Sequence, residues 1–382
     1  MRLSKYVRLF RVGERCFAES VLDERGVELD APALELARIL AEEGPIPPRL
    51  ASRLPMLLDL GMAVFSPEAD EEKLAAAHGE PAPEPIIDQL ELTNRCPMSC
   101  AMCPKGNGRD DRPLGQMDAG LFREILGQVS AAQKQWKPLA LYFEGESLLH
   151  PDLDAFVRLA AQAGVRPELS INPALLPLDR YRALEEAGIF RLVLSLDGLD
   201  AATLEGIRGR GARAQQAVAN VEAILEHRAR SRTASPALVL QMLRLKANAH
   251  QQAEFLARFA NTGLPGVLGY LKPLDANTPA HLFAEGERPR PMLCSAPWKT
   301  LVVLWDGRVV PCCHDPKAEW VLGDLRRQSL AEVWRSEQAQ RLRLRLRTGW
   351  PSPEGPCGRC AHRPDEWERP SLDAIPEEPL HW

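Results

Sequence analysis

Six short apolar runs alternate with five amphipathic stretches between residues 86 and 275, and this alternation is the strongest constraint on the fold. The apolar runs predict strands at 87–92, 139–143, 167–171, 192–196, 238–243 and 267–271. The stretches between them predict helices at 119–129, 153–163, 181–187, 214–228 and 252–260. Such an order forms a parallel sheet with right-handed crossovers and places functional groups at the carboxyl ends of the strands. Six strands are too few for a closed eight-stranded barrel, so we expect an α/β fold with an open or partial (β/α)6 barrel over residues 86–285.

Different patterns flank this array on both sides. Residues 1–66 contain short β-rich runs, two helical stretches at 31–44 and 50–60, and a final apolar run, which together predict a small winged-helix-like domain. Residues 67–85 are acidic and rich in Ala and Pro, as linkers are. Residues 286–382 are rich in Pro and Cys, with a hairpin signal at 305–308 and one predicted helix over 330–346, and are expected to form a small C-terminal domain.

Charge and cysteine usage narrow the class of protein. The net charge of -5 argues against nucleic acid or an anionic membrane as the main partner. The first residues contain no apolar run long enough for a signal peptide or a spanning helix, so the expected location is the cytoplasm. Thiols stay reduced there, and the nine cysteines are therefore expected to be ligands rather than disulfides.

The first cysteine set is Cys96, Cys100 and Cys103, directly after the first predicted strand. Thiolates select iron–sulfur clusters, zinc or copper(I). A cubane cluster takes four cysteines, so three without a nearby fourth would leave one iron open to a substrate or cofactor. The alternative is a zinc site completed by a distant His or Cys.

The spacing CxxxCxxC and the residues after the later strands resemble the radical S-adenosylmethionine (radical SAM) superfamily. EGES at 144–147 is similar to the family's GGEP, SIN at 170–172 to its TN signature, and SLDG at 195–198 to its SLDG signature. Arg208 in GIRGR resembles the family arginine that pairs with the methionine carboxylate. The resemblance implies that Cys96, Cys100 and Cys103 hold a catalytic 4Fe–4S cluster. It also implies that S-adenosylmethionine is bound by Gly145, Glu146, Ser170, Asn172, Ser195, Asp197 and Arg208.

Two positions depart from the family pattern. Met102 stands where the family usually places an aromatic residue near adenine, and its thioether can still pack there. Ser147 replaces the proline of GGEP. Neither change affects a charge or a ligand, so Met102 remains a predicted contact of the cofactor.

The second cysteine set is Cys294, Cys312, Cys357 and Cys360. Its chemistry suits a cubane cluster or a structural zinc equally well. The order of these cysteines resembles the "twitch" extension, a shortened SPASM domain, and this resemblance implies a fully ligated auxiliary 4Fe–4S cluster for electron transfer or for shaping the substrate pocket. Cys313 is interpreted as an alternative ligand, a hydrogen-atom donor or a small buried residue.

The resemblance implies reductive cleavage of S-adenosylmethionine to a 5′-deoxyadenosyl radical, with a flavodoxin- or ferredoxin-type reductant. One hypothesis is oxidative modification of a ribosomally made precursor peptide, because residues 1–66 resemble leader-peptide recognition modules, which add the strand of a leader to a sheet edge. A second is oxidation of a small molecule such as an aminocyclitol or a sugar. A third treats the clusters as non-enzymatic redox sensors, and it leaves Glu146, Ser195, Asp197 and Arg208 without a role.

Overall fold

The computed structural model describes residues 1–4, 6–12, 14–20, 26–60, 62–66, 69, 72, 79–108, 110–272, 279–283, 294–348, 355–358 and 360. Much of the predicted linker (67–68, 70–71 and 73–78) and residues 361–382 of the predicted C-terminal domain lie outside these ranges. None of the helices in the described ranges is both long enough and apolar enough to cross a membrane.

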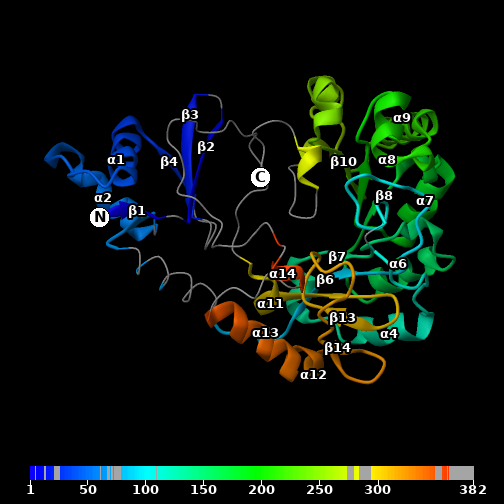
Figure 1. The fold of residues 1–382 in the computed structure, drawn as a ribbon. Coiled ribbons are helices and arrows are strands. Elements are labelled where there is room, and N and C mark those ends of the chain that lie inside the picture. Colours follow the sequence, from blue (N-terminus) through cyan, green and yellow to red (C-terminus); the bar gives the residue numbers. More distant parts are fainter. Residues whose placement is uncertain are drawn as a thin grey trace.

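A nine-stranded sheet organises the larger part of the protein (Figure 1). Its strands follow the order β11-β10-β9-β8-β7-β6-β12-β13-β14. The six neighbours from β6 to β11 are parallel and in sequence order, as expected from the alternation of strands and helices. They are β6 (Ile86–Leu90), β7 (Leu139–Ala140), β8 (Pro167–Ile171), β9 (Arg191–Ser195), β10 (Ala237–Leu243) and β11 (Val267–Lys272). The predicted partial (β/α)6 arrangement is confirmed.

Amphipathic helices connect these strands and bury their apolar faces against the sheet. Figure 1 shows α6, α7, α8 and α9 on its outer side. Asp118 caps the first of these helices by accepting the N–H of Leu121. The helices are α4 (Ala119–Gly127), α5 (Ala131–Trp136), α6 (Leu153–Gln162), α7 (Leu178–Ala187), α8 (Ala201–Arg208), α9 (Ala214–Ser231) and α10 (Gln252–Phe259). Short 3-10 turns lie at η2 (Ser147–Leu149), η3 (Pro173–Leu175), η4 (Arg210–Ala212), η5 (Lys246–Gln251) and η6 (Ala280–Leu282).

The C-terminal hairpin continues the same sheet. Strand β12 (Thr300–Val303) pairs in parallel with β6, and β13 (Arg308–Val310) and β14 (Gly323–Asp324) follow in antiparallel order. The predicted turn at 305–308 therefore lies between β12 and β13. Backbone hydrogen bonds thus join the hairpin of the predicted C-terminal domain directly to the barrel strands.

The helix predicted over 330–346 is divided into α12 (Leu330–Trp334) and α13 (Glu337–Thr348). Ser336 lies at the break, and its hydroxyl accepts the N–H of Ala339 in the first turn of α13. A serine that can cap a new helix therefore interrupts the apolar periodicity. Two further short helices, α11 (Ala296–Lys299) and α14 (Gly355–Gly358), carry or adjoin cysteines of the second set.

Residues 1–66 form a unit with its own core, on the left in Figure 1. An antiparallel sheet of β2 (Val7–Val12), β3 (Arg15–Ser20) and β4 (Gly26–Leu29) packs with the helices, and β1 (Arg2–Leu3) pairs with β5 (Ala63–Val64). The helices are α1 (Ala31–Ala41), η1 (Pro48–Arg53) and α2 (Leu54–Asp59). The order of strands, helices and a final strand agrees with the sequence pattern, and the winged-helix assignment of this unit stays a prediction.

Candidate functional site

The first cysteine set lies in the loop after β6, at the carboxyl end of the parallel strands. The loop is closed at its base because Thr93 bridges to Gln116 and donates its hydroxyl to the carbonyl of Gly115 at 2.7 Å. Asn94 adds two more hydrogen bonds, from its amide nitrogen to Pro113 O and from Gly115 N–H to its amide oxygen, both 2.9 Å. The cysteines are therefore presented from a braced loop.

The carboxyl end of α8 packs directly on this loop. The N–H of Ser99 donates to the carbonyl of Arg208, and the N–H of Ala101 donates to that of Ile207, at 3.3 and 2.9 Å. Gly209 must be glycine here, because its φ is +78° and a Cβ atom would lie 2.1 Å from the Ser99 hydroxyl. Gly209, the second glycine of GIRGR, thus allows the end of α8 to approach the cysteine loop closely.

Burial dominates the electrostatics of the three thiols. It raises the pKa of Cys96 to about 11, with further increases from the charges of Glu146 and Cys100. It also raises the pKa values of Cys100 and Cys103. Three buried thiols near carboxylates resist ionisation unless a cation compensates them, and iron is such a cation.

Glu144 is a site residue that the sequence analysis did not single out. The Cys103 thiol donates to its carboxylate at 3.4 Å, and burial raises the pKa of Glu144 to about 7. Its position in EGES, one residue before Gly145, was the available signal.

Gly145 and Glu146 join the ends of neighbouring strands. A Cβ atom on Gly145 would lie 1.9 Å from the carbonyl oxygen of Thr93, so only glycine fits. The carboxylate of Glu146 accepts the N–H of Asn172 at 2.9 Å and that of Leu148 at 3.1 Å. Burial raises the pKa of Glu146 to about 7, although these N–H groups and Arg208 lower it.

Asp197 and Arg208 form a buried ion pair of 2.6 Å. The other carboxylate oxygen of Asp197 accepts the N–H of Leu243 at 2.7 Å, which ties the end of β9 to β10. Burial opposes the charge of Arg208, but Asp197 and Cys100 keep its pKa above the usual value. Arg208 is thereby held charged beside the cysteine loop.

The remaining predicted contacts lie around the same end of the sheet. Asn172 donates to the carbonyl of Gly211 at 3.3 Å, and the hydroxyl of Ser195 accepts from Gln241 at 2.9 Å. Met102 packs against Ile207, Leu243 and Leu245. Ser170 is half-buried in β8, two residues before Asn172.

The second cysteine set also comes together in space. Burial and the charge of Cys360 raise the pKa of Cys294 to about 12. Burial raises that of Cys312 as well, with contributions from Cys313, Cys294 and Cys357. Cys357 is affected in the same way by Cys294 and Cys360. Each of the four predicted ligands therefore lies within electrostatic range of others in the set.

The number and kind of donors bear on the choice between a cluster and a single ion. In the described ranges, no three His, Cys, Asp or Glu side chains could hold one metal ion. Zinc needs its thiolates at about 2.3 Å from one point, whereas a cubane distributes its cysteines over different irons. Sets of three and four neighbouring cysteines fit 4Fe–4S clusters, which distribute their thiolates over different irons.

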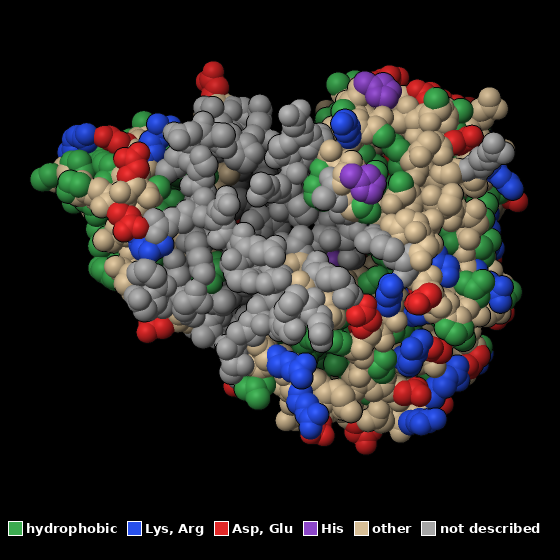
Figure 2. Space-filling view, viewed as in Figure 1, with side chains coloured by type: hydrophobic (Ala, Val, Ile, Leu, Met, Phe, Trp, Pro, Cys, Tyr) green, Lys and Arg blue, Asp and Glu red, His purple; other side chains and the backbone are tan. Residues whose placement is uncertain are grey.

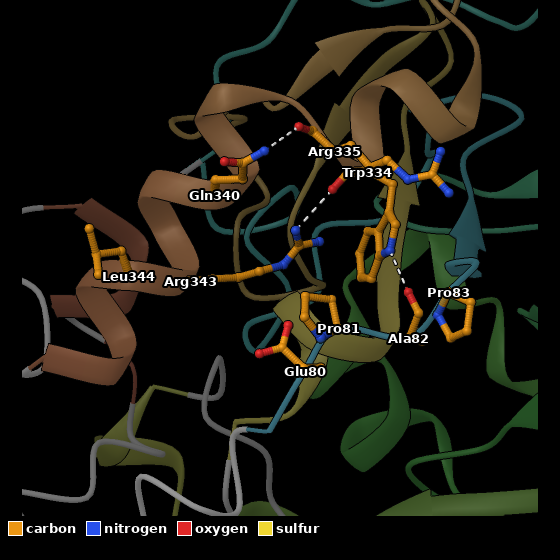
Figure 3. A pocket seen from close by; sticks show the side chains of 9 residues that line it. All are labelled: Glu80, Pro81, Ala82, Pro83, Trp334, Arg335, Gln340, Arg343 and Leu344. Carbon is orange, nitrogen blue, oxygen red and sulfur yellow. Dashed lines mark hydrogen bonds between the residues drawn. The ribbon is translucent and has the colours of Figure 1, made fainter.

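A separate groove of about 460 Å³ lies between residues 80–83 and the helices α12 and α13 (Figure 3). Its wall is fixed by hydrogen bonds from the Trp334 indole to Ala82 O at 2.8 Å and from Arg343 to Trp334 O at 3.0 Å. None of the predicted site residues lines it.

On the face visible in Figure 2, Lys and Arg side chains are interspersed with Asp and Glu over the larger part of the protein.

Comparisons with known proteins agree with this site. Residues 90–241 match the family model of the radical SAM superfamily, and residues 294–361 match that of SPASM, an iron–sulfur cluster-binding domain. The two matches contain both cysteine sets.

Three curated relatives extend over most of their own lengths. The tungsten-containing aldehyde ferredoxin oxidoreductase cofactor-modifying protein of Pyrococcus furiosus is 26% identical over 296 residues, 65% of this chain and 80% of the relative. A PqqA peptide cyclase of Rhodopseudomonas palustris is 26% identical over 317 residues, 73% of this chain and 80% of the relative. The S-adenosyl-L-methionine-dependent 2-deoxy-scyllo-inosamine dehydrogenase of Niallia circulans is 24% identical over 276 residues. The match covers 71% of this chain and 91% of the relative.

Among solved structures, SuiB of Streptococcus suis bound to S-adenosylmethionine superimposes with a TM-score of 0.51 at 14% identity, covering 98% of this chain and 96% of SuiB. This likeness concerns the fold alone. With the two family matches, the chain is a radical SAM enzyme with a C-terminal SPASM domain, and its cofactors are 4Fe–4S clusters and S-adenosylmethionine.

Proposed function

We propose that this enzyme oxidatively modifies a ribosomally made peptide and that residues 1–66 bind the leader of that peptide. The observation that carries the proposal is the N-terminal unit, which has a core of its own, separate from that of the barrel. This unit contains none of the predicted cofactor ligands, so we assign it a task other than the radical reaction.

The sheet of the N-terminal unit offers a place for an extended peptide. Within the described ranges, β2 and β4 each pair only with β3. An edge strand has backbone N–H and C=O groups that a further strand can satisfy. We therefore assign leader binding to an edge of this sheet.

Two comparisons support a peptide substrate. PqqA peptide cyclases are among the relatives, and SuiB has been solved bound to its precursor peptide SuiA, a structure that superimposes with a TM-score of 0.50 over 98% of this chain. A non-enzymatic role as a redox sensor does not agree with the family.

At the first site, we assign Cys96, Cys100 and Cys103 as ligands that leave one iron open. When bound, the cofactors supply a 5′-deoxyadenosyl radical that abstracts hydrogen from an unactivated C–H bond. Glu146 lies buried with its charge disfavoured, so it would pair with the amino group of S-adenosylmethionine. Arg208 would pair with the carboxylate of the same cofactor.

The other assigned contacts fix the position of the cofactor. Met102 and its apolar neighbours provide a surface for adenine, since a thioether packs well against an aromatic ring. Gly145, Ser170, Asn172, Ser195 and Asp197 complete the site. At the second site, Cys294, Cys312, Cys357 and Cys360 would ligate an auxiliary cluster fully, which leaves it the task of accepting an electron from the substrate radical.

A second candidate is oxidation of a small alcohol. It is favoured by the dehydrogenase relative, which this chain matches over 91% of the length of that protein. The two candidates differ in what residues 1–66 do. Under either, we place the enzyme in the cytoplasm with a flavodoxin- or ferredoxin-type donor, because a reducing compartment preserves the free thiols.

The test uses anaerobically reconstituted enzyme and any leader-bearing peptide that a short reading frame beside its gene is found to encode. We expect 5′-deoxyadenosine with dithionite, a peptide product of altered mass, and loss of that product when residues 1–66 are deleted. The deleted enzyme should still cleave S-adenosylmethionine, which serves as the control for an intact first site. Unchanged peptide turnover after the deletion, or neighbouring genes for sugar chemistry and turnover of an aminocyclitol, would favour the second candidate.

A further inference from the structure

A buried ion-pair network lies beside the first cysteine loop and has no role in the function proposed above. The guanidinium of Arg112 donates two parallel hydrogen bonds to Glu91, at 2.8 and 2.9 Å, and two more to Asp110, at 3.1 and 3.2 Å. The side chain of Arg112 is 3% exposed, and those of Glu91 and Asp110 are fully buried. Lys105 reaches Asp110 at 3.9 Å.

This network contacts the first site through the loop that follows β7. The guanidinium of Arg112 lies 5.8 Å from the ring centroid of Phe143, and the next residue, Glu144, accepts the thiol of Cys103. The charge of Arg112 also lowers the pKa of Glu144, against the larger effect of burial. Arg112 is thus linked to Cys103, a predicted ligand of the first cluster, through Phe143 and Glu144.

The same network contacts the hairpin of the SPASM domain. The carboxylate of Glu91 accepts the N–H of Trp305 at 3.3 Å, and the N–H of Glu91 donates to Val303 O at 2.8 Å. A Cβ atom on Gly115 would lie 2.2 Å from the Trp305 ring, so the chain around Arg112 packs directly on the hairpin.

A charge path continues from the hairpin to the second cysteine set. Asp315 is fully buried and accepts the N–H groups of Glu319 and Trp320 at 2.8 and 2.9 Å. The N–H of Asp315 donates to the carbonyl of Cys312 at 3.3 Å, so this buried carboxylate is fixed beside a ligand of the second set. The network therefore joins the segment that follows the first cysteine loop to the hairpin that leads into Cys312.

We propose that Arg112 is a positioning residue that joins the two cluster sites and sets the electrostatic potential at both. Its fork of donors fixes the loop of the first set to the hairpin of the second, and its charge stabilises the reduced, more negative form of each cluster. The inference rests on the assignment of the two cysteine sets given above. A purely structural ion pair would affect the stability of the fold and leave the redox properties of the clusters unchanged.

The test measures the midpoint potential of each cluster in the full-length, loaded enzyme by redox titration followed by electron paramagnetic resonance. The variants are Arg112→Gln, Arg112→Lys and Glu91→Gln. The matched control is Arg228→Gln, because Arg228 is equally buried but donates to the carbonyls of Thr233, Pro236 and Pro265. Iron content and reductive cleavage of S-adenosylmethionine by the wild type are measured first and test the proposed function independently.

Arg112→Gln should lower both potentials, with at least a tenfold fall in the ratio of reduced to oxidised cluster at a fixed applied potential, about 59 mV for one electron. Glu91→Gln should raise both, and Arg112→Lys should stay close to the wild type because it keeps the charge. Opposite shifts from the two members of one ion pair cannot arise from a shared loss of stability.

The inference is overturned if both clusters are loaded and neither potential moves, if only one cluster responds, or if Arg112→Gln and Glu91→Gln shift in the same direction. An equal shift in Arg228→Gln would also overturn it. Should Arg112→Gln fail to take up iron, Arg112→Lys and Glu91→Gln decide the question by the same criteria.

Discussion

Replacing Glu146 by glutamine tests whether its carboxylate is buried without a matching cation until the cofactor binds. The pKa of Glu146 rises from the ordinary 4.5 to about 7 because of burial. Each pKa unit is about 1.4 kcal/mol, so ionised Glu146 costs the cofactor-free fold about 3 kcal/mol. Between these two values the folded state holds the proton that the unfolded state has released, and the free energy of unfolding falls as the pH rises.

The assay is chemical denaturation of the cofactor-free, reduced protein between pH 5 and pH 8, for the wild type and for Glu146→Gln. Subtracting the two curves removes the groups they share. The wild type should lose about 2–3 kcal/mol of unfolding free energy relative to the variant over this range, and the difference should level off above pH 7. Glutamine also places an NH2 group against one of the two N–H donors, a cost of about 1–3 kcal/mol that does not vary with pH.

Glu332→Gln is the matched control for this titration. Glu332 accepts the N–H and hydroxyl of Ser329 in an exposed helix cap, and these hydrogen bonds lower its pKa. Above pH 5 this carboxylate is ionised in both the folded and the unfolded state, so the difference curve of this variant should be nearly flat over the same range. A difference for Glu146→Gln that is as flat as that of the control, or one in which the wild type gains stability as the pH rises, would refute the reasoning.

Three further outcomes are expected. Cys96→Ala should abolish formation of 5′-deoxyadenosine, whereas Cys357→Ala should leave that cleavage and lose substrate turnover, both measured by chromatography of the products. Gly115→Ala should destabilise the fold by about 1–3 kcal/mol in thermal unfolding, because the new Cβ overlaps the Trp305 ring. Gly127→Ala, which meets no atom within 4 Å, should not destabilise it and serves as the control. In the loaded enzyme, Glu146→Gln should weaken binding of S-adenosylmethionine roughly tenfold or more by equilibrium dialysis, because the pair with the amino group of the cofactor loses its charge.

Local patterns made much of the barrel predictable. The predicted and observed ends of the six parallel strands agree within two residues, except at the carboxyl end of β7. They could be predicted because each strand is a β-rich run between helix signals. Asp118 could be identified as a cap because a side-chain oxygen three residues before a free N–H is a local relationship. Helix α8 was not predicted. It is short, and Gly206 interrupts its apolar spacing.

Long-range contacts could not be predicted in the same way. Arg112 lies in the polar run RDDRP, which resembles an exposed loop, and its burial depends on Glu91, twenty-one residues earlier and directly after β6. Glu144 is similar, because its contact with Cys103 joins two loops. The pairing of β12 with β6 needs the whole sheet to be in place. These features depend on which strand ends meet, and no periodicity in the chain encodes that.

The parallel pairing of β12 with β6 has a consequence for how the enzyme can be divided. Thr300 to Val303 covers the outer backbone of Ile86 to Leu90, so a protein shortened before residue 294 would leave a central strand as a bare edge. Such an edge recruits other chains, and a minimal catalytic fragment cut there is expected to precipitate rather than to act alone. The boundary between the two cluster regions passes through a hydrogen-bonded sheet and not through a hinge. A chimaera with a different SPASM domain must therefore keep a strand that pairs with β6 as β12 does.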